Sequence, residues 1–118
     1  MLVEISSLSS NNEKIPISGI ACDATGMITD FGKGAEELFG WKASELIGKE
    51  RVTIFHTEEN IQKLVPRLLQ TASEKGVFEE EIMLLKKGGE SFRAILNVRP
   101  LKDGDQIVGF MGTTRTVV

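Results

Sequence analysis

Residues 35–48 read AEELFGWKASELIG, and this stretch does most to decide the fold. Apolar side chains recur at helical spacing up to residue 39, and Gly40 follows as a residue type that ends helices. Ser44 is a helix-capping residue type in front of a second short helical turn, which Gly48 ends. The stretch therefore predicts two short helices joined closely.

A β-hairpin is predicted on the N-terminal side of these helices. Residues 17–23 (ISGIACD) and 27–31 (MITDF) are short apolar runs, separated by the turn Ala24-Thr25-Gly26. Gly26 supplies the positive φ angle that such a turn needs.

A longer helix is predicted over residues 57–75, on the C-terminal side. Thr57 is an N-cap residue type, and Glu58 and Glu59 lie where the helix dipole favours acidic groups. Gly76 ends the helix, and Pro66 predicts a kink or a split within it. One apolar face recurs at 3.6-residue spacing and consists of Ile61, Leu64, Val65, Leu68 and Ala72.

The last 42 residues predict three antiparallel strands, over 77–87, 91–101 and 106–117. Gly88-Gly89 and Asp103-Gly104 are strong hairpin turns between them. Five strands with helices grouped in the middle predict an α+β fold: a five-stranded antiparallel sheet with short helices and one longer helix covering one face.

Composition restricts the classes of function. A chain of 118 residues is one domain, which we place at residues 17–118, after a flexible lead-in or capping segment over residues 1–16. A net charge of −3 argues against a nucleic-acid partner, and no apolar run is long enough for membrane insertion. The single cysteine excludes an internal disulfide and favours a reducing, cytoplasmic setting. With one histidine and no tyrosine we expect no catalytic residues, no metal site and no enzyme activity.

In this order the motifs resemble the PAS domain family over about residues 17–117. The resemblance is carried by residues 23–28, 35–41, 45–48, 55–59, 87–89, 99–101 and the Gly112-containing last strand. It implies a sensory and dimerisation module in a longer signalling protein, such as a histidine kinase, a cyclase or a regulator. Family members use the space between sheet and helices for haem, flavin, small metabolites or nothing. A ligand-free protein-interaction scaffold therefore remains an alternative.

The residues at the family's flavin positions argue against a photoreceptor. Members of the LOV group need a cysteine that adds covalently to the flavin, and Arg51 stands at that position here. Their amide side chains on the late strands correspond to Leu84, Ala94 and Thr114. The ring would thus find few partners for its buried polar edge.

His56 and Cys22 are the remaining candidates for chemistry. His56 directly precedes the long helix, and we expect it at a surface turn of the family; haem ligation through His56 is the alternative. Cys22 should point inward from the first strand as a small buried hydrophobe, since no Lys or Arg flanks it to activate the thiol.

Strand alternation predicts an apolar interior, either a packed core with at most a small void or a pocket for an apolar or weakly polar molecule. The small side chains of Ala94 and Gly112 are expected to leave room there. The predicted pocket residues are Ile20, Cys22, Phe39, Ile54, Leu68, Ile82, Leu84, Ala94, Leu96, Phe110, Gly112 and Thr114.

The opposite face of the sheet is predicted to carry Met83, Leu85, Ile95 and Met111 among polar residues. A sheet face that no helix covers should be mostly polar. We therefore expect a cover, which is a second copy of the domain in a homodimer, the N-terminal segment around Leu2-Val3-Ile5, or a flanking helix.

Overall fold

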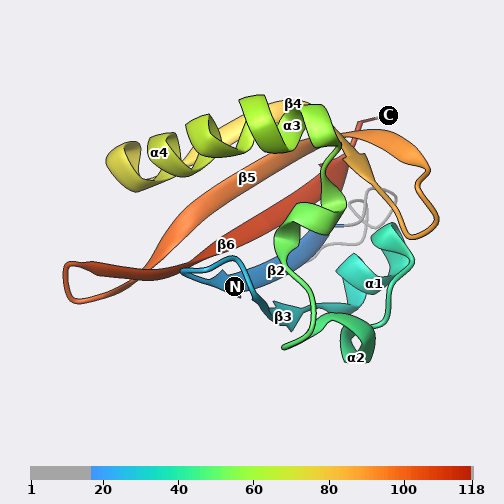
Figure 1. Cartoon of the computed structure of the whole chain (residues 1–118), viewed down its shortest axis with the longest axis horizontal. Coiled ribbons are helices and arrows are strands. Elements are labelled where there is room, and N and C mark those ends of the chain that lie inside the picture. The colour runs from blue at the N-terminus through green and yellow to red at the C-terminus, as the bar shows by residue number, and fades with distance from the viewer. Residues whose placement is uncertain (1–16, 118) are drawn as a thin grey trace, which may run out of the picture.

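The computed structural model describes residues 17–117 and confirms the predicted fold class. One antiparallel sheet runs in the order β3-β2-β6-β5-β4, and the helices lie against one of its faces (Figure 1). The strands are β2 (Ile17–Asp23), β3 (Ile28–Phe31), β4 (Phe78–Leu85), β5 (Ser91–Asp103) and β6 (Gln106–Thr116). The helices are α1 (Lys33–Phe39), α2 (Ala43–Leu46), the 3₁₀ helix η2 (Val52–Phe55), α3 (Glu58–Lys63) and α4 (Val65–Lys75). The predicted lead-in over residues 1–16 lies outside the described residues.

The central strand is the last one in the chain. β6 pairs with β2 on one side and with β5 on the other, so the N-terminal hairpin and the C-terminal strands form one sheet. Gly112 of β6 lies opposite both Ile20 and Val98. The helices pack against one face of these strands.

The turn between β2 and β3 is held by one carboxylate. Asp23 Oδ1 accepts hydrogen bonds from Thr25 Oγ1 at 2.6 Å, from the Thr25 N–H at 2.9 Å and from the Met27 N–H at 3.0 Å. The Thr25 hydroxyl contributes most to holding the Asp23 pKa below its ordinary value. Gly26 has φ of 89°, as the turn requires. The predicted hairpin is therefore fixed by its own side chains.

The start of α2 differs from the prediction. Its N-cap is Lys42 rather than Ser44. The reason is that glutamates, and not a serine, accept from the free N–H groups here. Glu45 Oε1 accepts from the Lys42 N–H at 2.8 Å, and Glu36 Oε2 accepts from the Ala43 N–H at 2.7 Å.

The predicted long helix is split, as Pro66 indicated. Thr57 caps α3, and its Oγ1 accepts from the Asn60 N–H at 3.1 Å. α3 ends at Lys63 and α4 begins at Val65, which places Pro66 in the first turn of the second helix. A proline is tolerated there because an N–H at that position would have no helical partner.

Four phenylalanine rings fill one end of the layer between sheet and helices. The Phe39 ring centroid lies 4.7 Å from that of Phe55, 5.5 Å from that of Phe92 and 6.3 Å from that of Phe31. The rings of Phe31 and Phe55 stack at 5.8 Å. We call these four residues the aromatic cluster. It packs the α1 side of the domain densely, in tilted and stacked arrangements that aromatic pairs favour.

Candidate functional site

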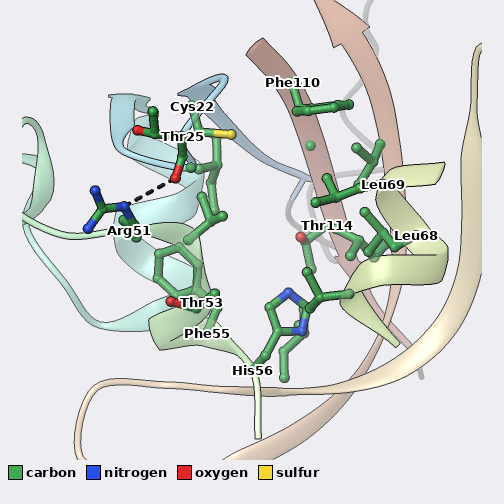
Figure 2. A pocket seen from close by; sticks show the side chains of 18 of the residues that line it. Cys22, Thr25, Arg51, Thr53, Phe55, His56, Leu68, Leu69, Phe110 and Thr114 are labelled. Atoms are coloured by element: carbon green, nitrogen blue, oxygen red, sulfur yellow. Dashed lines mark hydrogen bonds between the residues drawn. The ribbon is translucent and has the colours of Figure 1, made fainter. Parts of the chain in front are cut away.

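Beside the aromatic cluster, the layer between sheet and helices contains a cavity of about 190 Å³. Figure 2 shows side chains from the sheet and from the helices converging on it. The sheet side consists of Ile20, Cys22, Leu84, Leu96, Val98, Phe110, Gly112 and Thr114. The helix side consists of Phe39, Val52, Thr53, Phe55, His56, Val65, Leu68 and Leu69, and Ala24, Thr25, Gly26 and Arg51 complete the lining. Most of this surface is apolar, so the cavity suits a small apolar molecule.

Nine of the twelve residues expected at a pocket line this cavity, and Ile54, Ile82 and Ala94 do not. Ile82 and Ala94 are cross-strand partners on β4 and β5, and both are buried in the hydrophobic core. Ile54 lies on η2 and packs against the same core. Ala94 is fully buried, so the room that its small side chain leaves is already filled. Gly112, in contrast, borders the cavity as expected.

His56 lies differently from the expected surface turn. Its imidazole points into the cavity (Figure 2). Nδ1 is buried and has no hydrogen-bond partner. Burial lowers the pKa of His56 to about 4, so the ring is uncharged at neutral pH.

The local backbone explains this inward orientation. The His56 N–H donates to the Thr53 carbonyl at 3.1 Å, so residues 53 and 56 are related by a 3₁₀ turn. Side chains three residues apart in such a turn lie above one another. Thr53 and His56 accordingly both line the cavity. This spacing is the sequence signal that could have identified His56.

Arg51 closes one side of the cavity without pointing its charge inward. Its Nε donates to the Thr25 carbonyl at 3.1 Å, and the guanidinium turns away from the cavity (Figure 2). The Val52 N–H donates to the Gly26 carbonyl at 3.0 Å, and Met27 and Arg51 form a β-bridge. These bonds tie the β2–β3 turn to the start of η2, and they hold this wall of the cavity in place.

Cys22 lines the cavity from β2 as a buried thiol. Burial raises its pKa, and the neighbouring Asp23 charge acts in the same direction, while a backbone hydrogen bond to Phe110 opposes them. The thiol is therefore protonated at neutral pH, and it behaves as a small apolar side chain rather than a nucleophile.

The residues do not fit flavin or haem. At the positions expected for flavin, Leu84 and Thr114 line the cavity, while Ala94 is buried away from it. Arg51 occupies the expected cysteine position and is engaged with Thr25. His56 could ligate a haem iron. However, the cavity of about 190 Å³ is smaller than the 300–1,000 Å³ typical of pockets for drug-sized ligands, so it is too small for a haem.

Residues 17–117 contain neither a metal-binding cluster nor a membrane-spanning helix. No group of three His, Cys, Asp or Glu side chains could hold a metal ion there. Within the same range, no helix has the length and apolar character needed to cross a membrane.

The outer face of the sheet carries the four predicted apolar residues, but polar or small neighbours separate them. Met83 and Met111 are 38% and 36% exposed, and Leu85 and Ile95 are half-buried. Cross-strand pairing sets Met83 opposite Arg93 and Leu85 opposite Ser91. It sets Ile95 between Glu81 and Arg115, and Met111 between Arg99 and Ala21. The face is therefore mixed in character rather than continuously apolar.

Comparison with known proteins gives matches over nearly the whole described chain. The model of the PAS domain family matches residues 17–115. Two-component system protein A of Emericella nidulans is 31% identical over 93 residues, which are 79% of this chain. The chain spans only 14% of that protein's length.

Two solved structures show the same fold. The PAS domain of a protein from Colwellia psychrerythraea has a TM-score of 0.82 and 24% identity, and the match covers 88% of each chain. The PAS domain of a LuxR-family transcriptional regulator from Burkholderia thailandensis was solved in complex with ethanol. Its TM-score is 0.73 at 16% identity, with 86% of this chain and 89% of that chain covered.

Proposed function

The chain belongs to the PAS domain family, whose members are sensory modules, and we propose that it senses a small apolar molecule in the cavity. The observation that supports this most is the cavity itself. Tightly packed domains retain few voids larger than a water molecule, and the cavity here is about 190 Å³. An apolar cavity of about 150 Å³ in another protein binds benzene. Occupancy would change the packing between the sheet and α4, which supplies Val65, Leu68 and Leu69 to the lining.

We further propose that the module acts without catalytic activity in a longer, cytoplasmic signalling protein. The Emericella nidulans relative is a two-component system protein about seven times the length of the match. A histidine kinase or a response regulator is accordingly the output that we favour.

Native mass spectrometry of the freshly purified 118-residue chain tests the ligand. We expect a discrete additional mass that is lost on mild activation. Gly112→Leu should abolish it, because the new side chain projects into the cavity. Gly19→Leu is the matched control on the opposite face of the sheet, where a Cβ atom meets nothing within 4 Å. If no added mass is seen and no small apolar compound raises the melting temperature, the chain is a ligand-free scaffold.

For the outer face we propose a homodimer contact. The supporting observation is the exposed Met83 and Met111 side chains and the half-buried Ile95 on this face, among charged neighbours that could pair across a two-fold axis. Light scattering over increasing concentration should show dimers that Ile95→Glu dissociates. Ile47→Glu, at a 41% exposed isoleucine beyond α2, is the matched control and should remain dimeric. A chain that is monomeric at all concentrations contradicts this contact.

A further inference from the structure

The lining of the cavity includes one buried polar atom that lacks a hydrogen-bond partner. Among the described side chains that line it, His56 Nδ1 is fully buried and has no hydrogen-bond partner. Ser18 Oγ is also buried and unpartnered, but Ser18 does not line the cavity. Leaving a buried polar atom unpaired is costly, because its hydration is lost and nothing replaces it. A partner that arrives with a ligand would remove that cost.

The charges around the cavity favour an uncharged ligand. No Asp, Glu or Lys side chain lines it, the Cys22 thiol is protonated, and Arg51 directs its guanidinium away (Figure 2). The imidazole itself is uncharged at neutral pH, because burial lowers its pKa to about 4. A carboxylate or an ammonium group would lose its hydration without gaining a counter-charge.

The size and the lining of the cavity indicate how large and how apolar its ligand should be. A volume of about 190 Å³ exceeds only slightly the roughly 150 Å³ cavity that holds benzene in another protein. Leu68, Leu96, Val98 and Phe110 present apolar surface around it. The ligand should therefore be benzene-sized or slightly larger, and largely apolar.

We propose that the cavity recognises a small, uncharged, hydroxyl-bearing molecule whose hydroxyl group hydrogen-bonds to His56 Nδ1 while its apolar part fills the remaining space. A hydroxyl group both donates and accepts, so it can pair with Nδ1 in either tautomer of the neutral ring. This inference rests on the proposed ligand-sensing function and adds the chemical class of the ligand and the residue that selects it.

Phenol and toluene are matched probes for this hydrogen bond, since one carries a hydroxyl group where the other carries a methyl group. NMR titration of the ¹⁵N-labelled 118-residue chain gives both dissociation constants. Phenol should bind at least as tightly as toluene, because His56 replaces the hydrogen bond that its hydroxyl group loses on leaving water. His56→Leu should weaken phenol binding about tenfold and leave toluene binding unchanged or tighter.

Two further variants separate this hydrogen bond from a packing effect. His56→Asn places an amide group near the position of Nδ1 and should restore the preference for phenol. Thr114→Val removes the other buried polar side chain of the lining at constant size and should retain that preference. Loss of the preference in Thr114→Val, but not in His56→Leu, would assign the hydroxyl group to Thr114 and overturn the proposal.

The outcomes distinguish this inference from the proposed function. If toluene binds the unmodified chain more tightly than phenol does, the cavity is a ligand site but His56 does not select hydroxyl groups. The inference then fails while the proposed function stands. If neither probe binds up to its solubility, the inference fails, and the proposed function fails with it unless native mass spectrometry shows a bound mass.

Discussion

Two neighbouring regions lie between the inner face of the sheet and the helices, and they are packed in different ways. In the aromatic cluster, the phenylalanine rings that contact each other have centroids 4.7 to 6.3 Å apart. In the adjoining region Gly112, Cys22 and Thr114 are too small to meet the helices, and a cavity remains. Phe39 and Phe55 belong to both regions. Because Phe39 and Phe55 are packed against the other rings, they cannot move into the cavity without losing those contacts.

Truncating Phe39, a ring that belongs to both regions, should destabilise the protein most. Phe39 is almost fully buried and contacts three other rings, so Phe39→Ala should lower the free energy of unfolding by about 3–5 kcal/mol. Phe110→Ala is the matched change on the cavity side, at a half-buried ring that lies outside the aromatic cluster. It should cost less than half as much. Urea unfolding at pH 7 measures both, and equal losses would show that the two regions are packed alike.

The uncharged state of His56 should make stability depend on pH. The pKa of His56 falls from 6.5 in the unfolded chain to about 4 in the folded protein, so between these values the unfolded chain binds the extra proton. The free energy of unfolding should therefore decrease as pH falls from 7 to 4.5. His56 should contribute about 2–3 kcal/mol of this decrease.

The control for the pH effect is His56→Asn, which cannot titrate. Carboxyl groups such as Asp23 titrate in both proteins, and their contribution cancels in the difference. Urea unfolding at pH 7 and pH 4.5 gives that difference. Parallel pH profiles for the two proteins would mean that His56 is not buried in the uncharged form.

Two glycines on β6 differ in how much space an added side chain would have. A Cβ atom at Gly112 would lie 3.7 Å from Leu96 Cδ1, an ordinary contact, so Gly112→Ala should be neutral or stabilise by up to about 1 kcal/mol. A Cβ atom at Gly109 would collide with the backbone carbonyl of Cys22. Gly109→Ala should therefore destabilise by about 1–3 kcal/mol. Thermal unfolding of both variants tests this difference, and a destabilised Gly112→Ala would show that the cavity side is already full.

The smallest loss of stability is expected at the edge of the layer between sheet and helices, where α4 meets β4. Arg67 Nη1 and Nη2 lie 2.6 and 3.0 Å from the two carboxylate oxygens of Glu80. Hydrogen bonding to Arg67 holds the pKa of Glu80 below its ordinary value. Both side chains are 41% or more exposed, so Glu80→Gln should cost at most about 1 kcal/mol. Urea unfolding should show this loss shrinking in high salt, and a loss of several kcal/mol would mean that the pair is shielded from water.

Much of the fold was predictable because local signals and tertiary packing agree. Gly40, Pro66 and Gly76 marked ends and breaks of helices that the structure confirms. The start of α2 was not predictable, because its N–H groups are satisfied partly by Glu36, seven residues away from Ala43. In the site, strand alternation placed residues such as Cys22 and Gly112 on the cavity face. The inward orientation of His56 was missed because a 3₁₀ turn, and not the following helix, sets its direction.

The chain contains a single histidine, so its imidazole offers the most direct test of the proposed ligand recognition. NMR of the ¹⁵N-labelled His56 imidazole reports its protonation, its tautomer and its hydrogen bonding without overlap from other histidines. We predict a ring that stays uncharged down to about pH 4, with an Nδ1 signal that shifts saturably on addition of phenol and changes little with toluene. A ring that titrates near 6.5 and whose Nδ1 signal does not respond to phenol would show that His56 is neither buried uncharged nor the hydroxyl-binding residue.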